Sequence, residues 1–179
     1  MNEEKVYDGF HKIIKVKALM KGKEVWRERL VLKSAVAAFM LDENDRMALV
    51  TQFRPVPNVY TMELPAGLLD KEGLTPLETL IEEISEECHL GIEDILECNE
   101  KPIYEYYMTV GSSDAKLKMF EFKVKEQKEL EKEVDDVDVD KVGWYTFEEV
   151  ENFIREGKIQ DNKTLLAFNY WTIKRLKER

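Results

Sequence analysis

The chain has 179 residues, of which 44% are hydrophobic and 36% charged, as is typical of a single domain with one hydrophobic core. Its 37 acidic and 27 basic side chains give a formal charge of −10, which argues against a general DNA- or RNA-binding function. The longest apolar run, residues 35–41, is far shorter than the roughly 20 residues of a membrane span, and the first ten residues contain no apolar signal segment. We therefore expect a soluble, cytoplasmic protein with no membrane or nucleic-acid partner.

Hydrophobic alternation predicts a strand-rich chain. Residues 14–20 and 25–32 flank the turn sequence MKGKE and predict an N-terminal β-hairpin. The stretch 125–140, rich in lysine and acids, predicts a solvated loop or edge, and acids that project into a neighbouring cleft are the open alternative. The other candidate strands are residues 35–41, 47–53, 103–110, 116–124 and 142–145.

Apolar residues at helical spacing predict three helices, at residues 75–88, 146–157 and 162–176. The first is the clearest, because Thr75 and Glu78 form a capping-box pair and Pro76 suits the first helical position. Thr146 and Glu149 repeat the capping pattern at the second helix. Helices interspersed with at least five strands predict an α+β fold or an α/β sandwich.

The helix at residues 75–88 carries an unusual group of acids in its second half. Glu82, Glu83, Glu86 and Glu87 repel one another at helical spacing and lie near the negative end of the helix dipole. Glu83 and Glu87 are neighbours on one flank, and Glu86 is one step further round. Such a carboxylate patch suits a hard divalent cation, Mg²⁺ or Mn²⁺, and a solvated acidic face is the alternative.

The segment ELPAGLLDKEGLTPLETLIEEISEECHL, residues 63–90, resembles the Nudix box of the Nudix hydrolases. Its flanks AVAAFMLDENDRMALVTQFRP, VGSSDAKLKMFEF and GKIQDNKTLLAF are similar to the ADP-ribose pyrophosphatase branch, so the resemblance covers nearly the whole chain. It implies an α+β Nudix fold, an α/β/α sandwich around a mixed sheet with an N-terminal hairpin. It also implies a homodimer formed through residues 1–34, beside a Nudix domain at residues 35–179.

The activity implied by the resemblance is hydrolysis of a nucleoside diphosphate linked to another moiety, assisted by Mg²⁺ or Mn²⁺. Metal ions neutralise diphosphate oxygens and lower the pKa of an attacking water, and carboxylates hold those ions. Carried over residue by residue, the box glycine is Gly67. The catalytic and metal-binding carboxylates are Glu83, Glu86 and Glu87, and the backbone carbonyl of Ala66 is a further ligand.

Other site residues follow from the same resemblance. A loop acid that can act as general base in the family falls on Asp138, with Asp136 and Asp140 as alternatives in register and a charged edge strand as the alternative interpretation.

Four positions are expected near the substrate. Arg54 in TQFRP matches an arginine near the substrate phosphates or the metal-site carboxylates, although a generic surface arginine is the alternative. Glu63 matches an acid that supports the site or a partner subunit. Arg27 in WRERL matches a residue near the nucleotide, and Gly111 belongs to a loop that the branch uses for substrate.

Three box positions depart from the family pattern. The family's first glutamate falls on Leu74 after an apparent one-residue insertion, its arginine on Glu82 and its late glycine on His89. Because that arginine helps to orient a catalytic glutamate, a carboxylate at position 82 removes a positive partner. We therefore weigh two functions: a pyrophosphatase that splits ADP-ribose or a related nucleotide sugar into a nucleoside monophosphate and a sugar phosphate, and a catalytically weakened module that binds nucleotide or regulates a partner.

Overall fold

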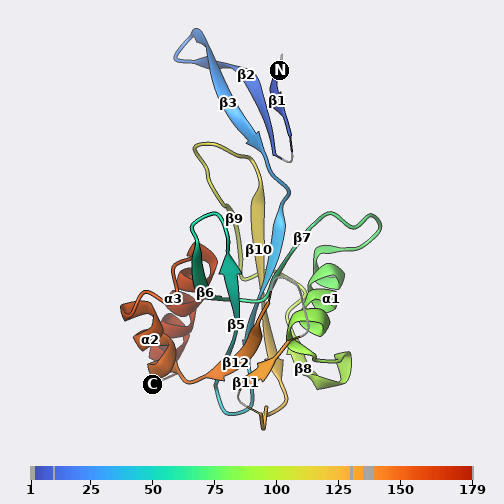
Figure 1. Ribbon diagram of the computed structural model, residues 1–179, viewed down its shortest axis with the longest axis vertical. Helices are drawn as coiled ribbons and strands as arrows, with labels where there is room; N and C mark the ends of the chain where they lie inside the picture. Colours follow the sequence, from blue (N-terminus) through green and yellow to red (C-terminus); the bar gives the residue numbers. More distant parts are fainter. Residues whose placement is uncertain (1–2, 10, 130, 135–138, 179) are drawn as a thin grey trace.

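The computed structural model describes residues 3–9, 11–129, 131–134 and 139–178. A small three-stranded sheet projects from one end of a larger body, in which a second sheet lies between α1 on one side and α2 and α3 on the other (Figure 1). The layered body confirms the predicted α/β/α sandwich. Among the described residues, no helix combines the length and the apolar character needed to cross a membrane.

The N-terminal sheet contains β1 (Glu3–Asp8), β2 (Lys12–Met20) and β3 (Lys23–Val31), paired antiparallel in that order. The predicted hairpin is therefore confirmed as β2 and β3. Its two-residue turn uses Lys21 and Gly22 at φ 50° and 76°, the backbone that a tight hairpin turn requires. The additional strand β1 was missed, because charged residues in EEKVYD mask its alternation.

The nine-stranded sheet has the order β11-β12-β5-β4-β10-β8, with β6 on β5, β7 on β4 and β9 on β10. The β4–β10 pair is parallel and the other pairs are antiparallel, so the sheet is mixed as expected. Three short strands, β6, β7 and β8, were not predicted, and β11 lies in the stretch predicted as a solvated loop or edge. The bounds are β4 (Ala35–Leu41), β5 (Met47–Arg54), β6 (Val59–Glu63), β7 (Ala66–Leu68), β8 (Ile95–Cys98), β9 (Tyr104–Tyr107), β10 (Lys116–Val124), β11 (Glu131–Glu133) and β12 (Lys141–Tyr145).

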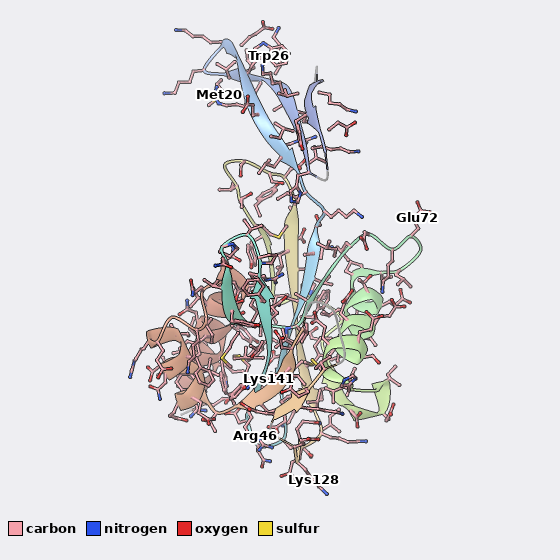
Figure 2. All side chains as sticks on the ribbon, in the orientation of Figure 1. Met20, Trp26, Arg46, Glu72, Lys128 and Lys141 are labelled. Carbon is pink, nitrogen blue, oxygen red and sulfur yellow. The ribbon has the colours of Figure 1, made fainter. Side chains whose placement is uncertain are left out.

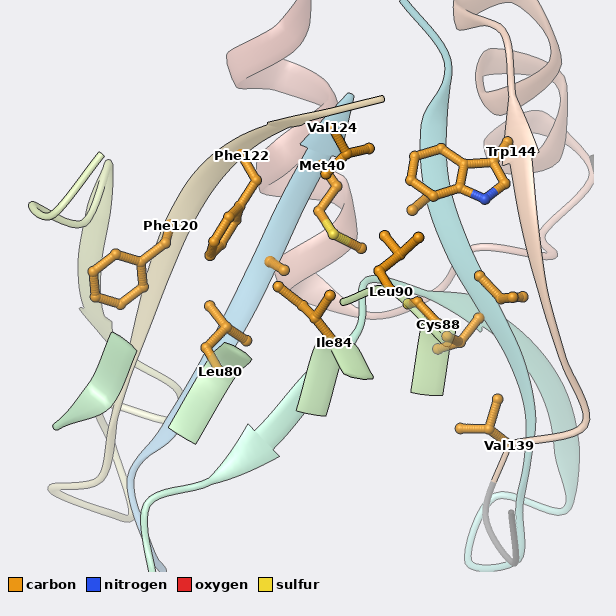
Figure 3. Packing of buried hydrophobic residues seen from close by; sticks show 14 of the residues in the cluster. Met40, Leu80, Ile84, Cys88, Leu90, Phe120, Phe122, Val124, Val139 and Trp144 are labelled. Carbon is orange, nitrogen blue, oxygen red and sulfur yellow. The ribbon is translucent and has the colours of Figure 1, made fainter. Parts of the chain in front are cut away.

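Strand β4 is buried throughout and supplies both cores, because successive side chains of a strand point to opposite faces. On one face Met40 packs with Phe122 against Leu80, Ile84 and Cys88 of α1 (Figure 3). The apolar stripe that predicted this helix is therefore its buried face.

On the opposite face of the sheet, Phe39 of β4 packs against α3. Its ring centroid lies 5.6 Å from that of Tyr170 and 6.3 Å from that of Trp171. The central strand β4 is thus packed on both faces. The sheet therefore gives helix α1, which carries the acidic residues, a rigid surface to pack against.

The three predicted helices are α1 (Pro76–Cys88), α2 (Phe147–Arg155) and α3 (Asn162–Lys177), and a single turn of 3₁₀ helix spans Ile92–Asp94. Both predicted capping boxes form: the side chain of Thr75 accepts from the amide of Glu78, and that of Thr146 accepts from the amide of Glu149. Helix α1 ends at His89, which takes the left-handed conformation at φ 55°. A glycine would reach this backbone more easily, so His89 performs the glycine's role at a conformational cost.

Candidate functional site

Strand β7 and helix α1 bring two of the predicted metal-site glutamates, Glu83 and Glu87, against Ala66 and Gly67. The backbone amide of Ala66 donates a 3.1 Å hydrogen bond to Oε2 of Glu87. A Cβ atom on Gly67 would overlap the side chain of Glu83. Glycine at this position is therefore explained by the close approach of the glutamate, and two helix carboxylates converge on the backbone of residues 66–67.

The acidic half of α1 is only partly neutralised within the chain. Burial and the neighbouring charge of Glu86 raise the pKa of Glu83, and the charge of Lys71 offsets part of this shift. Nζ of Lys71 lies 2.7 Å from Oε2 of Glu82 and 3.9 Å from Oε1 of Glu86. The lysine, which the sequence did not single out, therefore relieves some of the predicted repulsion.

The carboxylates of α1 have the donor chemistry that hard divalent cations prefer. However, within the described ranges no three acidic, histidine or cysteine side chains form a group that could hold a metal ion. Glu83 and Glu87 lie beside the β7 backbone, whereas the Glu86 side chain is 60% exposed and near Lys71. The donor types fit a divalent ion, and in the structure Glu83 and Glu87 are the two carboxylates that lie against the β7 backbone.

Arg54 and Glu63 form the best-defined charged contact near this site. Nε and Nη2 of Arg54 donate to the two carboxylate oxygens of Glu63 at 2.8 and 2.7 Å, the two-pronged geometry that suits a guanidinium. The buried Glu63 carboxylate also accepts hydrogen bonds from Lys163 and from the hydroxyl of Thr61. Glu63 is thus engaged by protein donors and holds Arg54 in place.

The electrostatics of this cluster favour the ionised carboxylate. Burial alone raises the pKa of Glu63, but the hydrogen bond from Arg54 and the charge of Lys163 outweigh it and lower the pKa to about 2. Hydrogen bonding to Glu63 raises the pKa of Arg54 against the effect of desolvation, and the charges of Asp161 and Glu87 raise it further. Arg54 is therefore held mainly by Glu63, with a smaller contribution from the charge of Glu87 on α1.

Lys163 and Thr61 were not identified by sequence reasoning. Asp161 caps α3 by accepting from the amide of Thr164, and its Oδ2 lies 3.1 Å from Nζ of Lys163. The hydroxyl of Thr164 in turn accepts from the amide of Leu64 at 2.9 Å. The available signal was a lysine beside a helix cap, which is too common a pattern to indicate a buried ion pair.

Arg27 and Gly111 lie in a second location, where they line one hollow of about 300 Å³ between the N-terminal sheet and the loop after β9. The amide of Leu30 donates to the carbonyl of Ser112 at 2.8 Å, which ties this sheet to the loop. A Cβ atom on Gly111 would meet nothing within 4 Å, so no protein contact requires glycine there.

Of the three candidates for the general base, one lies among the described residues. Asp138 and Asp136 lie outside the described residues. The third alternative, Asp140, precedes β12; its amide donates to the carbonyl of Thr51 at 2.9 Å. Strand β11 of the same charged stretch is exposed and pairs only with β12 among the described strands, which confirms the predicted solvated edge for this part.

The comparisons with known proteins identify the family. The Nudix domain matches residues 31–168, which is more than half of the chain. The chain belongs to the Nudix family. It is similar to the ADP-ribose pyrophosphatase of Bacillus subtilis (strain 168), with 28% identity over 159 residues that cover 87% of this chain and 81% of that protein. Together these matches support its assignment as a Nudix pyrophosphohydrolase.

Two further matches extend over most of the chain. The methanol dehydrogenase activator of Bacillus methanolicus is 25% identical over 171 residues, which cover 93% of this chain and 88% of that protein. The crystal structure of an ADP compounds hydrolase aligns with a TM-score of 0.73 at 14% identity, over 99% of this chain and 93% of that one. The structural match confirms the Nudix fold.

The departures in the Nudix box now have a structural context. His89 adopts the left-handed backbone expected of the missing glycine. Glu82 is paired with a lysine from the preceding loop, although the box arginine is absent. A positive partner is therefore present beside position 82, supplied by Lys71 of the loop and not by the helix.

Proposed function

We propose that this Nudix hydrolase cleaves the diphosphate of ADP-ribose or a related nucleotide sugar and yields a nucleoside monophosphate and a sugar phosphate. The observation that carries the proposal is the packing of Glu83 and Glu87 onto the backbone of Ala66 and Gly67. Similarity to an ADP-ribose pyrophosphatase over 87% of the chain supports the substrate class. Nudix hydrolases generally use divalent metals, which agrees with a site made of carboxylates.

In the proposed site, Glu83, Glu86, Glu87 and the carbonyl oxygen of Ala66 hold Mg²⁺ or Mn²⁺. When bound, the metal neutralises diphosphate oxygens and lowers the pKa of the attacking water. The chain's own residues supply the geometry. The hydrogen bond between Glu87 and the amide of Ala66 fixes the helix against the box loop, at a distance of 3.1 Å.

Arg54 acts as the fixed cation beside this site. Its two-pronged bond to Glu63 holds the guanidinium in one orientation, and Lys163 balances the charge of the buried carboxylate. A planar, permanently charged group suits a phosphate oxygen or a metal-bound carboxylate. Glu63 therefore contributes to substrate binding through Arg54.

Roles are also proposed for Asp138, Arg27 and Gly111. Asp138 is proposed as the general base, with Asp136 and Asp140 as alternatives. Arg27 and Gly111 are proposed to receive the nucleoside end of the substrate, because they line the same hollow of about 300 Å³. Such a volume lies at the lower end of the range for small-molecule sites.

We also propose a homodimer in which residues 1–34 form a dimerisation segment beside a Nudix domain at residues 35–179. Large apolar side chains of the N-terminal sheet are exposed, among them Leu19 at 74% and Trp26 at 46%. Exposed apolar groups on a small sheet with open edges favour association with a second copy.

A substrate panel tests the proposed activity. Purified protein with Mg²⁺ is incubated with ADP-ribose, other nucleotide sugars and dinucleotides, and the release of AMP or another monophosphate is measured. We expect cleavage by the natural protein and its loss in the Glu83→Gln, Glu87→Gln double variant. Cleavage that persists in this variant would contradict the proposed carboxylate site.

The alternative function is a weakened hydrolase that binds nucleotide or regulates a partner. It is favoured by the departures from the box pattern at Leu74, Glu82 and His89 and by the similarity to a methanol dehydrogenase activator. Binding of ADP-ribose in calorimetry without detectable cleavage of any panel member would support this alternative.

A further inference from the structure

The loop between β7 and α1, residues 69–75, is tethered on two sides. Figure 2 labels Glu72 near the tip of this loop, which stands away from the body. At its base, Oδ2 of Asp70 lies 2.9 Å from Nζ of Lys33, in the segment before β4. The next residue, Lys71, lies 2.7 Å from Oε2 of Glu82 on α1. Asp70 therefore connects the loop to the segment before β4, and Lys71 connects it to α1.

The contacts of Lys71 reach two acids of α1 that are one turn apart. Besides Glu82, its ammonium lies 3.9 Å from Oε1 of Glu86, and residues four apart lie on the same face of a helix. The side chains of Lys71 and Glu82 are 40% and 45% exposed. Exposed ion pairs contribute little to stability, so this contact matters mainly through the groups that it orients.

We infer that Lys71 is a positioning residue, which with Glu82 forms a loop-to-helix ion pair that replaces the missing box arginine. Compared with the family pattern, the charge at position 82 is reversed. The helix supplies the anion, Glu82, and the loop supplies the cation, Lys71. This pair holds the box loop against α1, on the helix face that also carries Glu86, and so sets where the Glu86 carboxylate lies. The inference rests on the proposed function only for its link to metal binding.

A charge swap tests this inference. The variants are Lys71→Glu, Glu82→Lys and the two substitutions combined. Two quantities are measured: the dissociation constant for Mn²⁺ alone, by calorimetric titration, and hydrogen exchange of the amides of residues 69–74 without metal. Melting temperatures establish that each variant is folded.

We expect each single variant to weaken Mn²⁺ binding about tenfold, as for other partners that orient metal ligands, and to speed exchange in the loop. The combined variant should return to within about twofold of the natural protein in Mn²⁺ affinity. Lys71→Glu is the decisive variant. If local charge alone mattered, its added carboxylate would attract the cation and tighten binding, and that result would overturn the positioning role.

A matched pair provides the control. Lys116 and Glu105 lie 3.0 Å apart with side chains that are both 40% exposed, on β10 and β9. Lys116→Glu combined with Glu105→Lys should leave Mn²⁺ affinity and loop exchange unchanged. If the natural protein neither binds Mn²⁺ nor cleaves the substrate panel, the proposed function fails, but loop exchange still decides whether the ion pair holds the loop. Unchanged exchange in both single variants would overturn the inference in either case.

Discussion

At the scale of single residues, the ion pairs of Glu63 decide how the site is held together. One carboxylate connects β5, β6 and α3 through Arg54 and Lys163. A buried carboxylate with two cationic partners is favourable only while it remains ionised, and removal of one member leaves the others uncompensated. The cluster therefore joins the stability of the protein to the orientation of Arg54.

This cluster predicts a specific pH dependence of stability. The pKa of Glu63 is lowered from its ordinary value of 4.5 to about 2, so its stabilising contribution is complete above pH 4.5 and is lost as the pH falls toward 2. We expect Glu63→Gln to lower the free energy of unfolding by about 3 kcal/mol at neutral pH. The difference from the natural protein should shrink between pH 4.5 and 2, as measured by urea unfolding at each pH.

The control for this prediction is Glu156→Gln. The Glu156 side chain is 55% exposed and pairs with Lys158 at 2.7 Å. We expect a change in stability of at most about 1 kcal/mol there. A constant difference between Glu63→Gln and the natural protein down to pH 2 would contradict the lowered pKa.

At the scale of elements, the site depends on the close contact between β7 and α1. The apolar face of α1 is anchored in the core by Leu80 and Ile84, so the helix cannot move outward to make room. Gly67 permits the side chain of Glu83 to lie directly against the strand. The geometry of the proposed metal site is therefore set by two elements whose separation is fixed by packing.

This contact predicts the effect of Gly67→Ala. The added methyl group overlaps the side chain of Glu83, so the carboxylate must move, and we expect activity on the best substrate to fall about 10- to 100-fold. The melting temperature should fall as well. In a Glu83→Ala background the overlap is removed, and Gly67→Ala should then cause little further loss of stability. An equal loss in both backgrounds would show that the methyl group acts on another neighbour.

At the scale of the whole molecule, the N-terminal sheet projects from the body (Figure 1). A hollow lined by Arg27 and Gly111 lies between this sheet and the loop after β9. The ion pair of Arg29 with Asp114, at 2.5 Å, and the backbone bond from Leu30 to Ser112 connect the two parts. Association through this sheet would therefore also affect the hollow.

The proposed dimer predicts the behaviour of surface variants. We expect the natural protein to sediment as a dimer at micromolar concentration. Leu19→Glu combined with Trp26→Glu should shift it toward a folded monomer, because charges replace exposed apolar groups. Leu176→Glu, on α3 at a position 65% exposed, is the control and should leave the dimer intact. A natural protein that is monomeric would contradict the shared-interface proposal.

The sequence by itself determined the layered fold and the acidic helix. The run at residues 35–41 predicted the central strand, and the capping box at Thr75 predicted where α1 begins. Both features are local: periodicity and caps are recorded in neighbouring residues, and the fold agrees with them. The Nudix resemblance added the box glycine, whose contact with Glu83 then explained why a side chain is excluded there.

Only the tertiary structure decided how charges are paired. Glu63 and Lys163 are 100 positions apart in the chain, and Lys71 and Glu82 are 11 apart across a loop. No periodicity records such contacts, because they arise where separately folded elements meet. The physical reason is that a side chain's charge is visible in the sequence, whereas the partner that neutralises it is selected by packing.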